Sequence, residues 1–444
     1  MKRRNFLSLS GTLALSPITG KLAKAANPGD TEPGIRDGMR KKNKIAGYTP
    51  GELLEQYHSF LFEDFLPFME KHVIDHDLGG FLWNTDRSGK NITTNKRTWY
   101  DGRGIWVYSF LYNNLKQDPS YLETAGKTVD FVLKINPGRK ALWPSSYTRD
   151  GRETKDFPQD IYGDLFIAEG LAEYSEASRD PNFRVMAKEI LLKCIDRYDR
   201  KDFSYVVDYG PVAPAIPAPR ILGHWMVLLR TSYCLLSHGP DKEAENIMKR
   251  CIDALMNFHN NPAYDLFNEV LNHDLSRPEG PLSQFVYAGH VIETLWMIMY
   301  EAVRIRDRKL FDSAAEKFKR HVEVAWDDVY GGVFRSLDNV DNNVWKVDKV
   351  LWEQAEVLIG TLYMIEHTGD PWAYEWFEKM YRYVIETYPL KKYGYSLWNI
   401  DGDRKATFKK EGTRIENYHH PRHLMLNILS LERIIRAGGK VISF

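Results

Sequence analysis

The sequence predicts an all-α protein, an (α/α)6 barrel or toroid with short β-hairpins on its loops. Apolar residues recur at helical spacing in about twelve segments along the chain. In order, these segments cover residues 51–73, 104–115, 120–135, 164–178, 183–198, 223–238, 242–258, 289–305, 309–326, 352–370, 372–388 and 423–437. Because no linker-like break follows residue 48, we expect a single catalytic domain over residues 49–444.

Short runs interrupt the helical segments, and each carries glycine, an aromatic or aliphatic residue and an Asp/Asn/Gly turn. They are GGFLWNTDRSGK at 79–90, GGVFRSLDNV at 331–340 and GYSLWNIDGDRK at 394–405. Each is expected to form a hairpin before another helix, which indicates a weak internal repeat of helix pairs. Helix pairs around a ring direct the loops of the inner helices toward a central pocket. An open superhelix and two separate bundles are the alternatives.

The N-terminus has the pattern of an export signal. Residues 1–25, MKRRNFLSLSGTLALSPITGKLAKA, combine a basic start, an apolar middle and an A-x-A arrangement of small residues. The pair Arg3-Arg4, followed by Phe6 and Leu7, resembles a twin-arginine signal, and an ordinary Sec signal is the alternative. Residues 26–48 are polar and rich in Gly, Pro and Lys, so we expect a flexible lead-in. The mature chain is expected to be exported, with the periplasm as its compartment.

Composition excludes several classes of protein. Lys plus Arg and Asp plus Glu each total 60, so no basic field attracts nucleic acid. No segment after the signal approaches the roughly 18 uninterrupted apolar residues of a membrane span. The three cysteines, Cys194, Cys234 and Cys251, lie in helix-like stretches and predict no disulfide framework. The 12 Trp and 25 Tyr suit both a large helical core and the apolar faces of sugars.

The stretch AGHVIETLWMIMYEA, 288–302, contains the first candidate for chemistry. His290 and Glu293 share one turn near the predicted start of a helix. One interpretation is a core-edge histidine that is hydrogen-bonded to a neighbouring carboxylate. The other is an acid/base histidine whose tautomer and pKa are set by Glu293.

The stretch YHHPRH, 418–423, contains three histidines and Arg422 within six residues. It lacks the H-E-x-x-H spacing of a zinc helix, so we predict no metal site there. Pro421 favours an extended backbone at His420, and the preceding sequence is strongly polar. The stretch is therefore either a solvated loop or one half of an acid/base pair.

Two further helix starts combine an aromatic ring with a charged group. In KRTWYDGRGIWVYSFLY, 96–112, Arg103 precedes the core-facing positions of a helix. In KVLWEQAEVLIG, 349–360, Trp352 and Glu356 stand four residues apart on one helical face. The plainer interpretations are an ion-pair arginine and a tryptophan that packs a barrel seam.

Together these stretches resemble the N-acylglucosamine 2-epimerase family, which includes cellobiose 2-epimerases and aldose-ketose isomerases. The resemblance follows chain order through KRTWYDGRGIW, DIYGDLFIAEGLAEY, GHVIETLW, KVLWEQAE and YHHPRHL. It implies that the catalytic residues are Arg103, His290 and His419. It implies that the substrate-binding residues are Trp99, Asp164, His224, Glu293, Trp296, Trp352, Glu356 and Arg422. Leu351 departs from a frequent family tryptophan, and Met226 competes with His224 for one position.

The expected activity is inversion of C2 in a reducing sugar, N-acylglucosamine- or mannosamine-like or a disaccharide. Two histidines on opposite faces would transfer the proton through an enediolate, and Arg103 would stabilise its charge. This chemistry requires no metal or redox cofactor, and the partner is a small sugar bound by a monomer or homodimer. An aldose-ketose isomerase is the main alternative. A glycoside hydrolase using Asp160, Asp164 or Glu293 and a non-catalytic glycan-binding protein are further alternatives.

Overall fold

The computed structural model describes residues 44–86, 88–138, 140–152, 154–155, 160–390, 395–396, 399–400 and 417–444. The predicted export signal and most of the lead-in therefore lie outside the described residues. The packed unit begins earlier than residue 49, however, because Ile45 and Ala46 are buried. Ile45 and Tyr48 also exchange two backbone hydrogen bonds in a tight turn, so the end of the predicted flexible segment is part of the fold.

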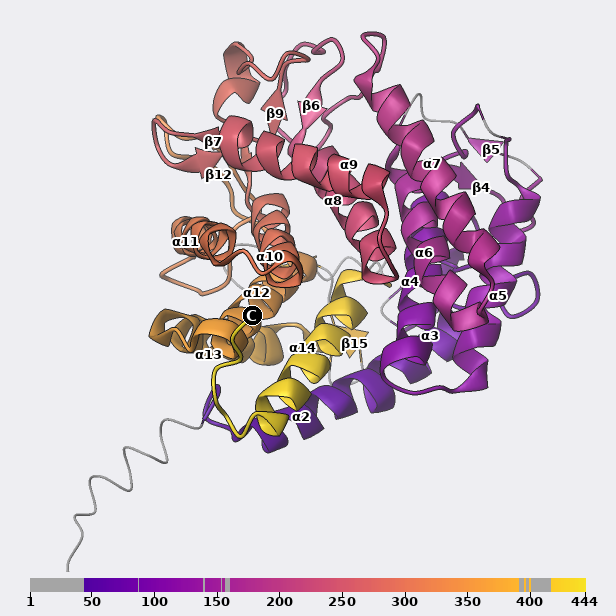
Figure 1. The fold of residues 1–444 in the computed structure, drawn as a ribbon, viewed down its shortest axis with the longest axis horizontal. Helices are drawn as coiled ribbons and strands as arrows, with labels where there is room; N and C mark the ends of the chain where they lie inside the picture. Colours follow the sequence, from indigo (N-terminus) through magenta and orange to yellow (C-terminus); the bar gives the residue numbers. More distant parts are fainter. Residues whose placement is uncertain are drawn as a thin grey trace, which may run out of the picture. The chain divides into compact units, whose positions relative to one another are not determined.

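Six helices form an inner ring, in which each contacts the next and the last contacts the first (Figure 1). They are α4 (Thr98–Asn114), α6 (Tyr162–Ser178), α8 (Leu222–Ser237), α10 (Ala288–Ile305), α12 (Leu351–Thr368) and α14 (His419–Arg436). An outer layer alternates with them along the chain. It contains α2 (Pro50–His58), the π-helical segment Ser59–Phe65, α3 (Leu66–His72), α5 (Pro119–Lys134), α7 (Pro181–Asp199), α9 (Lys242–Asp253), the π-helical segment Ala254–His259, α11 (Arg308–Ala325) and α13 (Pro371–Thr387). This is the predicted alternation of outer and inner helices.

The two layers begin in different ways. Six outer helices, α2, α5, α7, α9, α11 and α13, start with a side-chain N-cap. In each, a backbone N–H of the first turn donates a hydrogen bond to the side-chain oxygen of the preceding residue, which is Thr49, Asp118, Asp180, Asp241, Asp307 or Asp370. The residue that precedes each inner helix makes no such cap. The inner ends therefore keep the positive end of the helix dipole without an N-cap acceptor.

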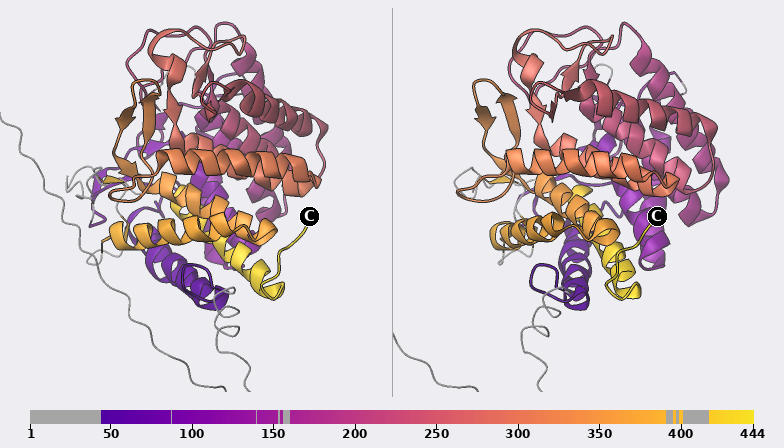
Figure 2. Two further views of the ribbon diagram at one scale, coloured as in Figure 1. Left: turned by 90° about the vertical axis from the view of Figure 1, so that its left-hand side faces the viewer. Right: turned by 60° about the vertical axis from the view of Figure 1, so that its left-hand side comes forward.

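Short antiparallel strands gather at one end of the ring (Figure 2). The pairings join β1 (Asn84–Thr85) to β2 (Asn91–Thr93), β3 (Lys96–Arg97) to β4 (Ser146–Tyr147) and β5 (Thr154–Lys155), β6 (Arg220–Ile221) to β9 (Val270–Leu271), β7 (Asn260–Asn261) to β8 (Leu266–Phe267), β10 (Val286–Tyr287) to β11 (Ser336–Asn339) and β12 (Val344–Lys346), β13 (Lys349–Val350) to β16 (Asn399–Ile400), and β14 (Pro389–Leu390) to β15 (Tyr395–Ser396). A 3₁₀ turn covers Gly280–Gln284. Strands β3, β6, β10 and β13 run directly into inner helices, so the sheets fix where those helices start.

The predicted repeat is visible in the loop before α4. The backbone N–H of Asp75 donates to the carbonyl of Gly80, and the carbonyl of Asp75 accepts from the N–H of Gly79. Both glycines have φ near +80°, which favours glycine. The Asp75 carboxylate forms an ion pair with Lys96, at the start of β3, with 2.9 Å between Oδ2 and Nζ. The loop is thereby tied to the strand that leads into α4.

The same arrangement recurs before α12. Asp327 pairs through the backbone with Gly331 and Gly332, which have φ of +77° and +80°, and its carboxylate binds Lys349 of β13. Trp352 follows Lys349 at the spacing by which Trp99 follows Lys96. The two loops therefore confirm the repeat of helix pairs, and the third predicted hairpin, at 394–405, lies largely outside the described residues.

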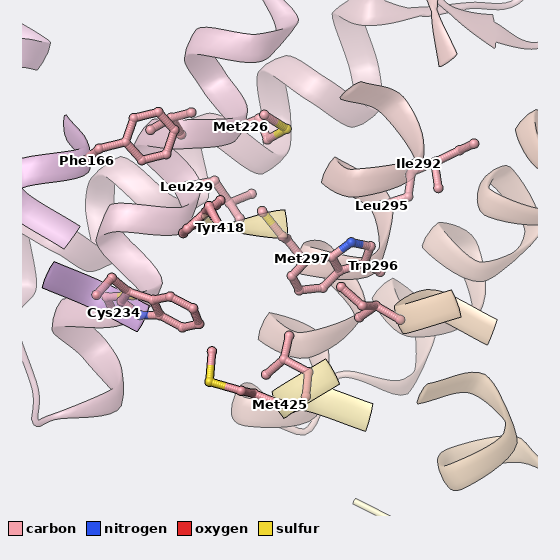
Figure 3. Packing of buried hydrophobic residues seen from close by; sticks show 14 of the residues in the cluster. Phe166, Met226, Leu229, Cys234, Ile292, Leu295, Trp296, Met297, Tyr418 and Met425 are labelled. Carbon is pink, nitrogen blue, oxygen red and sulfur yellow. The ribbon is translucent and has the colours of Figure 1, made fainter. Parts of the chain in front are cut away.

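Large apolar side chains of the inner helices fill the interior below the strand end (Figure 3). Trp106, Trp225 and Trp296 are almost completely buried. The three cysteines are buried and free, as predicted. In the described part of the chain, no helix combines the length and apolarity that crossing a bilayer requires.

Glu353, in the first turn of α12, is a buried carboxyl group that permits a test of the packing. The side chain is fully buried, and neither oxygen has a hydrogen-bond partner among the described residues. Burial raises its pKa well above the usual value, which the charge of Arg335 offsets only in part. The folded state therefore keeps the proton after the unfolded chain has lost it.

We expect Glu353→Gln to remove a pH-dependent loss of stability. Below pH 4.5 both states of the wild type are protonated, and the contribution is fully present. As the pH rises toward the folded-state pKa, the wild type should lose about 1.4 kcal/mol of unfolding free energy per pH unit relative to the variant. Urea unfolding at pH 5 to 8 measures this difference, with the exposed Glu55→Gln as control. Parallel pH curves for wild type and Glu353→Gln would contradict it.

Candidate active site

The three predicted catalytic residues lie near the N-terminal ends of inner helices, at the strand end of the ring. His290 is in the first turn of α10, His419 begins α14, and Arg103 lies in the second turn of α4. The indole of Trp352 lies 5.9 Å from the His290 ring and 4.9 Å from the His419 ring, measured between centroids. Two histidines separated by more than a hundred residues therefore lie next to one aromatic ring.

His290 pairs with a carboxylate that the sequence did not indicate. Its Nδ1 lies 3.0 Å from Oε1 of Glu269, a fully buried residue between β8 and β9. The hydroxyl of Tyr209 donates to the same oxygen at 2.8 Å. The prediction that Glu293 is the partner of His290 is wrong, because the Glu293 carboxylate accepts a hydrogen bond from Arg422 instead.

His419 pairs with Glu356, a residue predicted to bind substrate, at 2.9 Å between Nδ1 and Oε1. One guanidinium nitrogen of Arg422 donates to Glu356 at 2.7 Å and to Glu293 at 2.6 Å. The indole N–H of Trp296 donates to the other oxygen of Glu356 at 2.7 Å. Burial raises the pKa of Glu356 to about 8, although Arg422 opposes this shift. Trp296 and Arg422, both predicted to bind substrate, thus hold Glu356 in place.

Glu293, Glu356 and His419 offer ligand atoms within 4.8 Å of one another, close enough for a metal ion. The guanidinium of Arg422 already lies between the two carboxylates and 3.1 Å from Nδ1 of His419. The positive charge that balances these carboxylates is therefore provided by an arginine of the chain.

Aromatic faces surround the guanidinium of Arg103. Its carbon lies 4.1 Å from the ring centroid of Phe166, 4.8 Å from that of Tyr418 and 5.3 Å from that of Trp99. Tyr418 also lies 4.5 Å from the guanidinium of Arg422. Cation–π contacts of this kind hold a planar cation in a fixed orientation. The half-buried Trp99 is thus beside the predicted catalytic arginine.

Tyr418 is held in place through its hydroxyl group. Its hydroxyl donates to both oxygens of Glu169, at 2.7 and 2.9 Å, and Arg230 donates to Glu169 at 2.9 Å. These side chains come from α6, α8 and the residue before α14. The Tyr418 ring, which contacts both arginines, is therefore held by the buried ion pair of Glu169 and Arg230.

His224 lies on α8, next to the part of that helix that approaches His290. Its imidazole is fully buried, 4.5 Å from the ring centroids of both Tyr162 and Tyr205, and burial lowers its pKa. The preceding residue is Gly223, where a Cβ atom would stand 2.8 Å from the ring of His290. Glycine at this position lets α8 approach His290 closely, while His224 itself is enclosed by aromatic rings. Met226, its competitor, is also buried.

Asp164 does not lie where a sugar contact is expected. Its carboxylate accepts a hydrogen bond from the backbone N–H of Trp143 at 2.9 Å and pairs with Lys193 of α7 at 2.5 Å. Burial of Asp164 is complete. The residue joins an inner helix to an outer helix, so the predicted substrate-binding role is corrected to a structural one.

The stretch 418–423 is not an extended loop. Helix α14 includes Pro421 in its first turn, where the missing N–H leaves no intrahelical bond unmade. His420 packs 5.6 Å from the ring of Phe65, and His423 packs 5.7 Å from that of Tyr57. Burial lowers the pKa of His420 to about 4. Both histidines support the attachment of α14 to the outer layer.

Comparison with known proteins agrees with this geometry. The family model described as N-acylglucosamine 2-epimerase (GlcNAc 2-epimerase) matches residues 79–421. The chain belongs to the N-acylglucosamine 2-epimerase family. The matched range contains Arg103, His290 and His419, together with both glutamates that pair with the histidines.

Members of the N-acylglucosamine 2-epimerase family resemble the chain over most of its length. The N-acylglucosamine 2-epimerase of Bos taurus is 25% identical over 389 residues, which cover 83% of this chain and 90% of the relative. The cellobiose 2-epimerase of Dictyoglomus turgidum is 25% identical over 279 residues, 59% of this chain and 68% of the relative. The structure of cellobiose 2-epimerase from Spirochaeta thermophila superimposes with a TM-score of 0.72 at 20% identity, covering 87% of this chain and 98% of that one. The predicted (α/α)6 barrel is confirmed.

Proposed function

We propose that the chain inverts C2 of a reducing sugar by proton transfer between His290 and His419. The observation that carries the proposal is the pair of His–Glu contacts whose two imidazoles both lie next to the ring of Trp352. Each imidazole uses Nδ1 for its carboxylate, and Nε2 is the ring nitrogen to which we assign the proton transfer. Two acid/base groups on different helices can approach one carbon from opposite faces.

The reaction divides into two proton transfers. After ring opening, one neutral imidazole removes the C2 proton, and the C–H electron pair moves into an enediolate with the former aldehyde. The enediolate is planar at C2. The imidazolium on the opposite face then donates its proton to C2, and the electron pair returns to the carbonyl group. One histidine gains the proton that the other loses, so the pair is restored by exchange with solvent or by the reverse reaction.

The negative charge of the enediolate has two sources of stabilisation in the ring. Arg103 cannot lose its proton and is held by aromatic faces. The uncapped ends of the inner helices also direct their positive dipole ends toward the strand end of the barrel. Preorganised charges of this kind act more strongly in the transition state than in the ground state.

The carboxylates of the ring disfavour glycoside hydrolysis. That reaction needs one carboxylic acid and one free carboxylate across a pocket. Asp164 is committed to Lys193, and Glu293 is committed to Arg422. Hydrolysis would also leave both His–Glu pairs without a task.

The substrate class that we propose follows the names of the relatives, an N-acylated hexosamine or a disaccharide with a free reducing end. The test is incubation of the purified chain in heavy water with N-acetylglucosamine, N-acetylmannosamine, cellobiose and mannose, followed by NMR. We expect the C2 epimer of at least one sugar, with deuterium at C2 and no ketose. Accumulation of ketose would identify an aldose-ketose isomerase, and glucose released from cellobiose would identify a hydrolase. The double variant His290→Asn/His419→Asn is the blank.

A further inference from the structure

Glu269 has a different environment from the glutamate that pairs with His419. Its Oε1 is 3.0 Å from Nδ1 of His290, 2.8 Å from the hydroxyl of Tyr209 and 3.4 Å from the backbone nitrogen of Gly223. Among the described residues, no lysine or arginine forms an ion pair with Glu269. Glu356, by contrast, shares its charge with Arg422. The negative charge of Glu269 is therefore directed at one imidazole and two neutral donors.

The segment that carries Glu269 is held rigidly. Its backbone nitrogen donates to the carbonyl of Phe285, and its carbonyl accepts from the nitrogen of Leu222, both at 2.8 Å. The neighbouring Asn268 is fixed through its carbonyl, which lies 2.6 Å from Nδ1 of the buried His259. The side chain of Asn261 donates to that of Asn268 at 2.9 Å. A carboxylate on such a segment keeps its position when a substrate binds.

Several titratable or aromatic groups face His290 from the elements packed around it. They are Glu269 between β8 and β9, Tyr209 in the loop before β6, Tyr287 of β10, Trp352 of α12 and, one residue beyond Gly223, His224 of α8. In this set Glu269 carries the fixed charge, and burial together with nearby charge favours the neutral form of Tyr209. The state of the His290 ring is therefore set mainly by Glu269.

On the basis of the proposed function, we infer that Glu269 is a positioning residue for His290 and that Tyr209 moderates its charge. Glu269 accepts a hydrogen bond from the Nδ1–H of His290, which keeps Nε2 available to the sugar. The Tyr209 hydroxyl donates a hydrogen bond to Oε1 of Glu269 and so reduces the negative charge that this oxygen presents to His290. Because Tyr209 lies in the loop between α7 and α8, that loop takes part in setting the basicity of the catalytic histidine.

For the C2 epimer from which His290 removes the proton, two variants should move the acidic limb of the kcat/KM profile in opposite directions. In Glu269→Gln the imidazolium loses its counter-charge, so the limb should move to lower pH by about one unit, and kcat should fall about 100-fold. In Tyr209→Phe the carboxylate loses a donor and offers more charge to the ring, so the limb should move to higher pH. Glu269→Asp should restore part of kcat, and Tyr121→Phe, on α5, should leave the limb in place. If Glu269 and Tyr209 had a purely structural role, the variants would lower the height of the kcat/KM profile but would not shift its acidic limb in opposite directions.

An NMR readout separates this inference from the proposed function. In protein labelled with ¹⁵N-histidine, the His290 signal is assigned by its loss in His290→Asn. We expect the Nδ1–H tautomer in the wild type and a shift toward Nε2–H in Glu269→Gln. An unchanged tautomer, or limbs that move together, would overturn the role of Glu269. A wild type that is inactive on every probe sugar would overturn the proposed function, and the tautomer would still decide the inference.

Discussion

Replacing His419 by asparagine is expected to lower the rate of C2 epimerisation by about 10² to 10⁴-fold, the usual contribution of a positioned acid/base group. Asparagine keeps a polar group beside Glu356 but cannot carry a proton to carbon. The loss should appear in kcat, because the proposed role of His419 is to act on the reacting atom. Steady-state kinetics on the sugar that the wild type epimerises measures it.

The control for this variant is the half-exposed His76→Asn, which should retain full activity because His76 contacts Glu70 on the outer surface. The melting temperature of His419→Asn should stay close to that of the wild type, since Arg422 still holds both carboxylates. Retention of more than a tenth of the wild-type kcat would show that His419 is not the acid/base group.

The second large effect is expected at Arg103. Arg103→Met should reduce kcat by about 10² to 10³-fold, because the enediolate loses a fixed cation. Arg103→Lys should recover only part of this loss, since an ammonium group lacks the planar faces that pack on Phe166 and Tyr418. The separate measurement of kcat and KM is decisive here.

A change confined to KM in Arg103→Met would contradict this role, because it would show equal binding of ground and transition states. Arg97→Met is the matched control. Arg97 is the residue before α4, its guanidinium lies 4.0 Å from the ring of Trp83, and it is not assigned to the site. It should retain wild-type kcat.

The sequence predicted the ring and one part of the site for a physical reason. Inner and outer helices are both long and periodic, so their apolar positions are detectable without the fold. Lys96 and Lys349 also precede Trp99 with Arg103 and Trp352 with Glu356 at equal spacing, a sequence signal that becomes evident only beside the two matching loops of the structure. The helix starts were less accurate. Helix α4 begins at Thr98 and not near residue 104, since Thr98, Asp101 and Arg103 in its first turns break the apolar pattern.

The pairing of Glu269 with His290 could not be predicted from local pattern. The two residues are 21 positions apart, and Tyr209 is 60 positions from Glu269. Their contact depends on the pairing of β6 with β9 and on the close approach that Gly223 permits. Asp164 shows the opposite failure. It occupies a matching motif position, but its carboxylate faces α7, and orientation around a helix is set by tertiary packing.

The most direct test is solvent exchange at C2 in the two single variants, each offered both C2 epimers of the sugar that the wild type converts, in heavy water. A base on each face predicts that His290→Asn exchanges the C2 proton of one epimer only and His419→Asn that of the other only, with no net epimerisation by either. Exchange of the same epimer by both variants, or epimerisation by either one, would contradict the assignment of the two histidines to opposite faces.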